Sequence, residues 1–172
     1  EIQRPVNRLR TMLVMERFLV RANDVLPATA LLKGGLALEL RLERARTTRD
    51  IDFRFMGSAD DTTGLLEHIA AAILEPDDHL RFTISPDPKH PTIDGDGIVY
   101  EGLRYRARCT LAGRSYADPF GVDVAHGDIV HGTPRDVVIG ASLAFAGVPP
   151  STFRVYPLES HIAEKLHAYT LP

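Results

Sequence analysis

The spacing of apolar residues predicts three amphipathic helices. The first covers residues 6–23, the second follows residues 60–62 and ends before Pro76, and the third covers residues 158–169. In each, apolar side chains return every three or four residues, which places them on one face of a helix. The side chains expected to be buried are Leu9, Leu13, Leu19 and Val20 in the first helix, Leu65, Leu66, Ile69, Ile73 and Leu74 in the second, and Leu158, Ile162, Leu166 and Tyr169 in the third.

Strict alternation of apolar and polar residues over 103–111 predicts a strand with one buried face. Further strands are expected over 29–32, 50–55, 81–85 and 121–125, and a short helix over 36–42 separates the first two. This order indicates an α+β fold in which helices flank a mixed β-sheet. We expect a core domain over residues 1–150 and, over 151–172, the start of a C-terminal helical region that continues beyond residue 172.

Length and composition narrow the class of protein. The 172 residues suffice for one core, and a net charge of −3 confines any nucleic-acid contact to a local basic patch. The single cysteine, Cys109, excludes an internal disulfide. No apolar run approaches the roughly 18 residues that span a bilayer, and no signal-peptide pattern is present. We therefore expect a cytoplasmic protein with no membrane partner.

Gly34 and Gly35 lie where a predicted strand gives way to a helix. The first turn of a helix leaves backbone N–H groups unpaired at the positive end of the helix dipole, so a glycine pair there suits a phosphate group. Lys33, directly before the pair, would add a positive charge. The alternative is a tight turn that uses glycine for its backbone freedom, with Lys33 as a surface lysine.

Asp50 and Asp52 alternate along a predicted strand, so their carboxylates share one face about 7 Å apart. Two carboxylates at this spacing suit Mg²⁺, or Mn²⁺, that also holds nucleotide phosphates. Asp123 is the polar residue of another apolar strand and is a candidate third carboxylate and general base. The alternatives are solvent-facing carboxylates at positions 50 and 52 and an arginine-paired carboxylate at 123.

Arg104, Arg106 and Arg108 form a ladder of positive charge on one face of the strand over 103–111. Such a ladder is a candidate surface for RNA phosphates. Pairing with Asp and Glu residues on the outer face of the sheet explains it equally well, and the sequence does not decide between the two.

Four short motifs stand out: Leu32-Lys33-Gly34-Gly35, Thr48-Arg49-Asp50-Ile51-Asp52, Val122-Asp123-Val124 and Ala163-Glu164-Lys165-Leu166. They resemble motifs of the DNA-polymerase-β-like nucleotidyltransferase superfamily, and within it of the AbiEii/MenT-type toxin nucleotidyltransferases. The resemblance implies a nucleotidyltransferase-like fold with a mixed sheet. It also implies that Lys165, on the predicted last helix, contacts the triphosphate. By the same resemblance, Thr48, whose hydroxyl is expected on the face of Asp50, and Arg49 are expected to join Lys33, Gly34 and Gly35 in binding the nucleotide. Catalysis is expected to depend on Asp50, Asp52, Asp123 and Lys165. One departure is Leu36, where many relatives have Ser or Thr.

The function that the resemblance implies is that of a toxin in a toxin–antitoxin pair. Such an enzyme would transfer a nucleoside monophosphate from an NTP to an RNA acceptor, expected to be the tRNA 3′ end, and so block translation. Its partners would be the NTP, the RNA and a cognate antitoxin protein. Two alternatives stay open: transfer to a small-molecule or protein hydroxyl, and a nucleotide- or RNA-binding module without catalysis.

Overall fold

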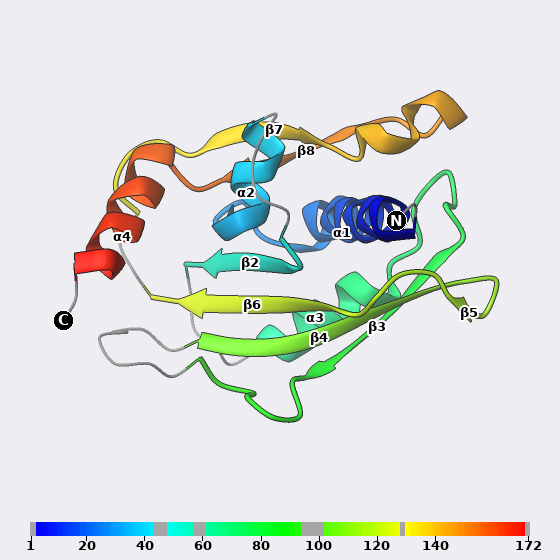
Figure 1. The fold of residues 1–172 in the computed structure, drawn as a ribbon, viewed down its shortest axis with the longest axis horizontal. Coiled ribbons are helices and arrows are strands. Elements are labelled where there is room, and N and C mark those ends of the chain that lie inside the picture. The colour runs from blue at the N-terminus through cyan, green and yellow to red at the C-terminus, as the bar shows by residue number, and fades with distance from the viewer. Residues whose placement is uncertain (1–2, 43–47, 57–60, 94–101, 128–129, 171–172) are drawn as a thin grey trace.

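The computed structural model describes residues 3–42, 48–56, 61–93, 102–127 and 130–170 (Figure 1). The helices are α1 (Gln3–Val25), α2 (Gly34–Arg41), α3 (Thr62–Ala71) and α4 (Leu158–Thr170), with a 3-10 helix η1 (Ala141–Ala146). The strands are β1 (Leu31–Lys33), β2 (Asp50–Phe55), β3 (Leu80–Pro86), β4 (Gly102–Leu111), β5 (Arg114–Ser115), β6 (Phe120–His126), β7 (Arg135–Ile139) and β8 (Ser151–Val155).

The strands form one mixed sheet. Within the described ranges it has eight strands in the order β3-β4-β6-β2-β1-β8-β7, with β5 paired to β4. β2 runs parallel to β6 and β1 parallel to β8, whereas β1–β2, β4–β6, β3–β4 and β7–β8 are antiparallel. Helix α4 lies at the end of the sheet toward which β2 and β6 point (Figure 1). The predicted fold, a mixed sheet flanked by helices, is confirmed.

Alternation along the strands builds the core. Ile51, Phe53 and Phe55 of β2 are at most 6% exposed, and Val122 and Val124 of β6 are fully buried. Helix α1 packs on this apolar face through Phe18, whose ring lies 5.5 Å from that of Phe82 and 5.7 Å from that of Phe120. Fully burying side chains of this size stabilises the fold by about 1.5–3 kcal/mol each. The polar residues of the same strands therefore face the opposite side.

Two arginines on α1 are also buried. Arg17 and Arg21 both donate to the carboxylate of Asp78, with N–O distances of 2.8 and 2.6 Å and side-chain exposures of 2% or less for all three residues. Arg21 donates further to the carbonyl oxygens of Ala72 and Leu80. Helix α1 is thus tied to the segment between α3 and β3 by charge as well as by apolar contact.

Several sequence expectations need correction. Leu9 is 68% exposed and Ile73 is 60% exposed, because the buried face of α1 is shifted toward Val14 and Phe18 and α3 ends before Ile73. In α4, Ile162 and Leu166 are 49% and 61% exposed, so that expected apolar face is not covered by the described residues.

The strands β7 and β8 have no counterpart among the predicted elements. β8 follows the expected boundary at residue 150 and still pairs with β1, so residues 151–155 extend the central sheet and the C-terminal helix begins at Leu158. The division into a core and a C-terminal helical region stays a prediction. No helix in the described part of the chain has both the length and the apolar character needed to cross a membrane.

Candidate nucleotide and metal site

Four charged side chains form a row across four neighbouring strands. Arg104 of β4 lies opposite Asp123 of β6, Asp123 lies beside Asp52 of β2, and Asp52 lies opposite Lys33 of β1. Directly paired residues on neighbouring strands share a face, with strands about 4.8 Å apart. The order of charge along the row is therefore positive, negative, negative, positive. Asp50 lies on the same face two residues before Asp52, in register with Gly121.

Glycines leave the space that the two carboxylates of β2 occupy. Gly34 has φ +71°, and a Cβ there would lie 1.7 Å from Oδ2 of Asp52. A Cβ on Gly121 would lie 2.4 Å from Oδ1 of Asp50. Both glycines are thus required by close approach, and Gly34 also by its left-handed backbone. The start of α2 and the first half of β6 together shape the surroundings of Asp50 and Asp52.

The electrostatics of Asp52 follow from this crowding. Burial and the negative charges of Asp123 and Asp50 raise the pKa of Asp52 to about 6, although the charge of Lys33 and a hydrogen bond from the backbone N–H of Gly35 act in the opposite direction. That N–H belongs to the first turn of α2, so the helix amide expected to meet a phosphate already donates to a carboxylate. Repulsion between neighbouring carboxylates is the feature that a bound cation would offset.

The residues present fit a divalent cation held by two carboxylates. Asp50 and Asp52 share a face, are flanked by glycines and repel each other. Among the described residues no group of three or more His, Cys, Asp or Glu side chains is placed to hold a metal ion. Mg²⁺ is commonly bound through one or two carboxylates while water and substrate phosphates complete its shell. The expected ligands Asp50 and Asp52 are compatible with that pattern.

Asp123 is engaged by Arg104. The Nε of Arg104 donates to Oδ1 and Oδ2 at 2.9 and 3.2 Å, and Nη2 donates to Oδ2 at 2.9 Å. The side chains are 38% and 17% exposed, and this contact raises the pKa of Arg104. The two-pronged contact is the strong form of an arginine–carboxylate pair. Asp123 therefore lies beside the other carboxylates with its oxygens directed to an arginine.

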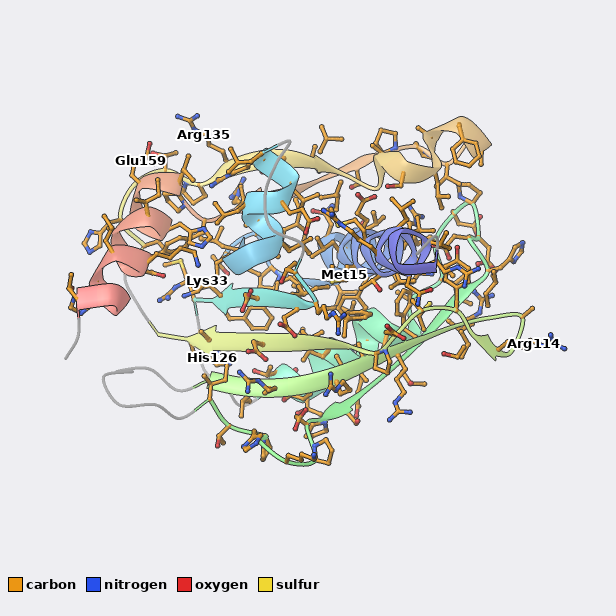
Figure 2. The ribbon with its side chains drawn as sticks, viewed as in Figure 1. Met15, Lys33, Arg114, His126, Arg135 and Glu159 are labelled. Carbon is orange, nitrogen blue, oxygen red and sulfur yellow. The ribbon has the colours of Figure 1, made fainter. Side chains whose placement is uncertain are left out.

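Helix α4 is attached to the site through Glu164. Its Oε2 accepts a hydrogen bond from Nζ of Lys33 at 3.3 Å, and its Oε1 accepts one from the hydroxyl of Tyr156 at 2.8 Å. The Lys33 ammonium also lies 5.8 Å from the centroid of the Tyr156 ring, which is a cation–π distance. Figure 2 shows Lys33 between the sheet and α4. Glu164 thus joins the helix that carries Lys165 to the strand that precedes the glycine pair.

The remaining predicted residues lie around this row. Lys165 is exposed on α4, next to Glu164, and it contributes after burial to the lowered pKa of His161. Thr48 lies at the entrance to β2, where its Oγ1 accepts from the N–H of Asp50 at 3.3 Å. The carbonyl of Arg49 accepts from the N–H of Gly121 at 3.1 Å, and Arg49 is exposed. The functional roles of these residues remain predictions.

The arginine ladder of β4 is only partly paired. Arg104 binds Asp123, and Nε of Arg106 lies 3.8 Å from Oδ2 of Asp87. Both contacts agree with the alternative explanation of the ladder, in which its arginines pair with acidic residues. Arg108 is exposed on the same face. Its role at an RNA surface stays a prediction.

A cavity of about 920 Å³ lies away from the carboxylates. It is lined by the C-terminal end of α2, by β7 and by the start of α4, with Arg41, Arg135 and Glu159 among its residues. In Figure 2 Arg135 and Glu159 lie near the upper end of α2, whereas His126 lies well below its lower end. The carboxylate row, in contrast, lies on the face of the sheet, so the candidate chemistry and this cavity are separate features.

Two structural contributors were not recognised from the sequence. Glu164 stands in the quoted Ala-Glu-Lys-Leu motif, but only the fold shows that it contacts Lys33 and Tyr156. Arg54, two residues after Asp52 on the same face of β2, is fully buried, with its Cζ 6.0 Å from the centroid of the Tyr156 ring. An arginine in an apolar strand was a signal that could have marked this position, because arginine is seldom fully buried unless paired.

Comparison with known proteins identifies the family and a solved structure with the same fold. A family model described as the AbiEii nucleotidyl transferase toxin of type IV toxin–antitoxin systems matches residues 17–171. A crystal structure described as a proposed nucleotidyltransferase from H. pylori shares the fold, with a TM-score of 0.56 and 20% identity over 94% of this chain. This chain spans 57% of that protein. No curated protein matched the chain. Because the family model covers nearly all of the sequence, the chain belongs to the AbiEii nucleotidyl transferase toxin family.

Proposed function

We propose that this chain carries the nucleotidyltransferase centre of a toxin in a toxin–antitoxin pair. It would transfer a nucleoside monophosphate from an NTP to a hydroxyl of RNA, the tRNA 3′ end being the expected acceptor, with release of pyrophosphate. A modified tRNA end would block translation, and a cognate antitoxin protein would restrain the enzyme. The observation that carries the proposal is the alignment of Asp52, Asp123 and Lys33 beside the glycine pair.

The nucleotide would bind between the start of α2 and α4. In this arrangement Lys33 and Lys165 approach the triphosphate from two elements that Glu164 holds together. Thr48, Arg49 and the backbone of Gly34 and Gly35 would border the same phosphates. Catalysis of phosphoryl transfer depends mostly on positioning and charge, and lysines held by strand and helix supply both.

The carboxylates would hold the cation and accept a proton. Asp50 and Asp52 would hold Mg²⁺ or Mn²⁺, which when bound neutralises charge on the transferred phosphoryl group. Asp123, which lies beside Asp52 on the adjoining strand, would complete the shell of that cation and accept the proton of the attacking hydroxyl. Of the arginines on β4, Arg108 is the one best placed to meet RNA phosphates, since its neighbours on the ladder already contact carboxylates.

The test is labelling of RNA. The protein is incubated with total tRNA, Mg²⁺ and each α-labelled NTP in turn, beside Asp52→Asn and, as a matched control, Asp118→Asn at an exposed position away from the row. Label in tRNA that Asp52→Asn abolishes and Asp118→Asn retains would support the reaction, the donor and the acceptor together. Pyrophosphate release without RNA label would move the acceptor to another molecule. Neither label nor pyrophosphate would overturn the proposal.

A further inference from the structure

Two groups are placed to bind the carboxylate of Asp123. One is Arg104, which already contacts both of its oxygens through three hydrogen bonds. The other is the cation expected at Asp50 and Asp52, since Asp123 is the direct neighbour of Asp52 on the adjoining strand. A guanidinium that donates to both oxygens of a carboxylate occupies most of its lone pairs, so few remain to bind a cation.

The present contacts favour Arg104. The three carboxylates are close enough for Asp123 to contribute to the raised pKa of Asp52, yet they are not arranged to hold an ion as a group of three. This is the arrangement expected when the carboxylate of Asp123 lies near the other two but is turned toward Arg104. Arg104 is itself 38% exposed, so solvent and substrate can reach it and separate the pair.

We propose that Arg104 is a positioning residue that competes with a divalent cation for Asp123. This inference rests on the proposed function. Asp123 joins Asp50 and Asp52 around the cation only after Arg104 releases it, and an anionic substrate group that binds Arg104 favours that release. By linkage, the factor by which the contact between Arg104 and Asp123 weakens cation binding equals the factor by which the bound cation weakens that contact.

Binding of Mn²⁺, followed by the electron paramagnetic resonance signal of the free ion, tests this competition without any turnover. Arg104→Gln is expected to bind Mn²⁺ roughly three- to fivefold more tightly than the wild type, the weight of a partly exposed ion pair. Arg106→Gln is the matched control, because it removes the same charge from the same face and strand while its contact is with Asp87. The gain in Mn²⁺ affinity for Arg106→Gln is expected to be smaller, because this substitution removes a nearby positive charge without releasing Asp123.

A double-mutant cycle separates release of Asp123 from loss of a nearby charge. In the background of Asp123→Asn, adding Arg104→Gln should no longer tighten Mn²⁺ binding, because the carboxylate under competition is absent. Arg104→Lys keeps the charge but cannot form the two-pronged contact, so it should fall between the wild type and Arg104→Gln.

The outcomes distinguish this inference from the proposed function. If Mn²⁺ binding depends on Asp52 but Arg104→Gln behaves as Arg106→Gln does, the competition is wrong and the proposed metal site stands. If the gain from Arg104→Gln survives in Asp123→Asn, the competition is also wrong. If neither the wild type nor any variant binds Mn²⁺, both the inference and the cation part of the proposed function are overturned.

Discussion

Gly34→Ala offers a direct test of how the start of α2 shapes the site. The substitution places a methyl group on a backbone with φ +71° and 1.7 Å from Oδ2 of Asp52. A left-handed backbone costs a non-glycine residue about 1–2 kcal/mol. The contact is far inside van der Waals distance, so the Asp52 carboxylate must rotate away and give up its hydrogen bond from the Gly35 N–H, at a cost of about 1 kcal/mol more.

Gly113→Ala is the matched control. Gly113 has φ +74° in the turn between β4 and β5, and a Cβ there would meet no atom within 4 Å. It therefore shares the backbone cost and the altered entropy of the unfolded chain, but not the collision. We expect about 1–2 kcal/mol of destabilisation for Gly113→Ala and about 2–3 kcal/mol for Gly34→Ala, a difference of roughly 2–4 °C in melting temperature.

The functional readout should separate the two variants further. Displacing Asp52 disturbs the proposed cation site, so we expect Gly34→Ala to lose about 100-fold in tRNA labelling, in line with an error of about 1 Å in a reacting group. Gly113→Ala should label tRNA as the wild type does at a temperature where both are folded. Equal unfolding free energies and equal Mn²⁺ affinities for the two variants would refute the role assigned to Gly34.

Three further predictions concern other parts of the chain. Asp78→Asn should destabilise the fold by about 3–5 kcal/mol in urea titrations, because two buried arginines lose their counter-ion. Burial would raise the pKa of Asp78, but the hydrogen bonds from the two arginines outweigh it and lower the pKa. In the wild type the stability that ionised Asp78 contributes should therefore be lost only as the pH falls below the unfolded pKa of about 3.9. The pH–stability curve of Asp78→Asn should lack this component. Lys165→Ala should weaken NTP binding about tenfold by calorimetry, as expected for a lost charge-assisted contact, while His167→Ala, at an exposed position two residues further on, should not. Burial raises the pKa of Cys109 to about 11, so iodoacetamide at about pH 8 should label the thiol only after unfolding.

The sequence predicted well the elements whose pattern is local. β2 spans Asp50–Phe55 as expected, and β4 shows the predicted alternation, with Tyr105, Ala107 and Cys109 buried. Both follow from a period of two that needs no knowledge of the partner strands. β7 and β8 carry a weaker signal because both are short. β7 is exposed at most of its positions, and the alternation of β8 places only two apolar side chains, Phe153 and Val155, in the core.

Contacts between distant segments could not be read from the pattern. The shared face of Asp50 and Asp52 follows from their spacing, but the ion pairs of Asp123 with Arg104 and of Lys33 with Glu164 depend on strand order and on the placement of α4. The arginine ladder shows the same limit. Its regular spacing was visible, whereas the carboxylates that meet Arg104 and Arg106 come from β6 and from the residue after β3.

The register between β2 and β6 explains why carboxylates that repel each other are nevertheless adjacent. Ile51 pairs with Val122 and Phe53 with Val124, and all four are buried. A slip of one residue would turn these side chains to the polar face and Asp52 toward the core. At about 1.5–3 kcal/mol for each buried side chain, the four together outweigh the repulsion of one like-charged pair, which is worth up to about 1 kcal/mol. The core therefore fixes the charged row, and burial together with this repulsion raises the pKa of Asp52.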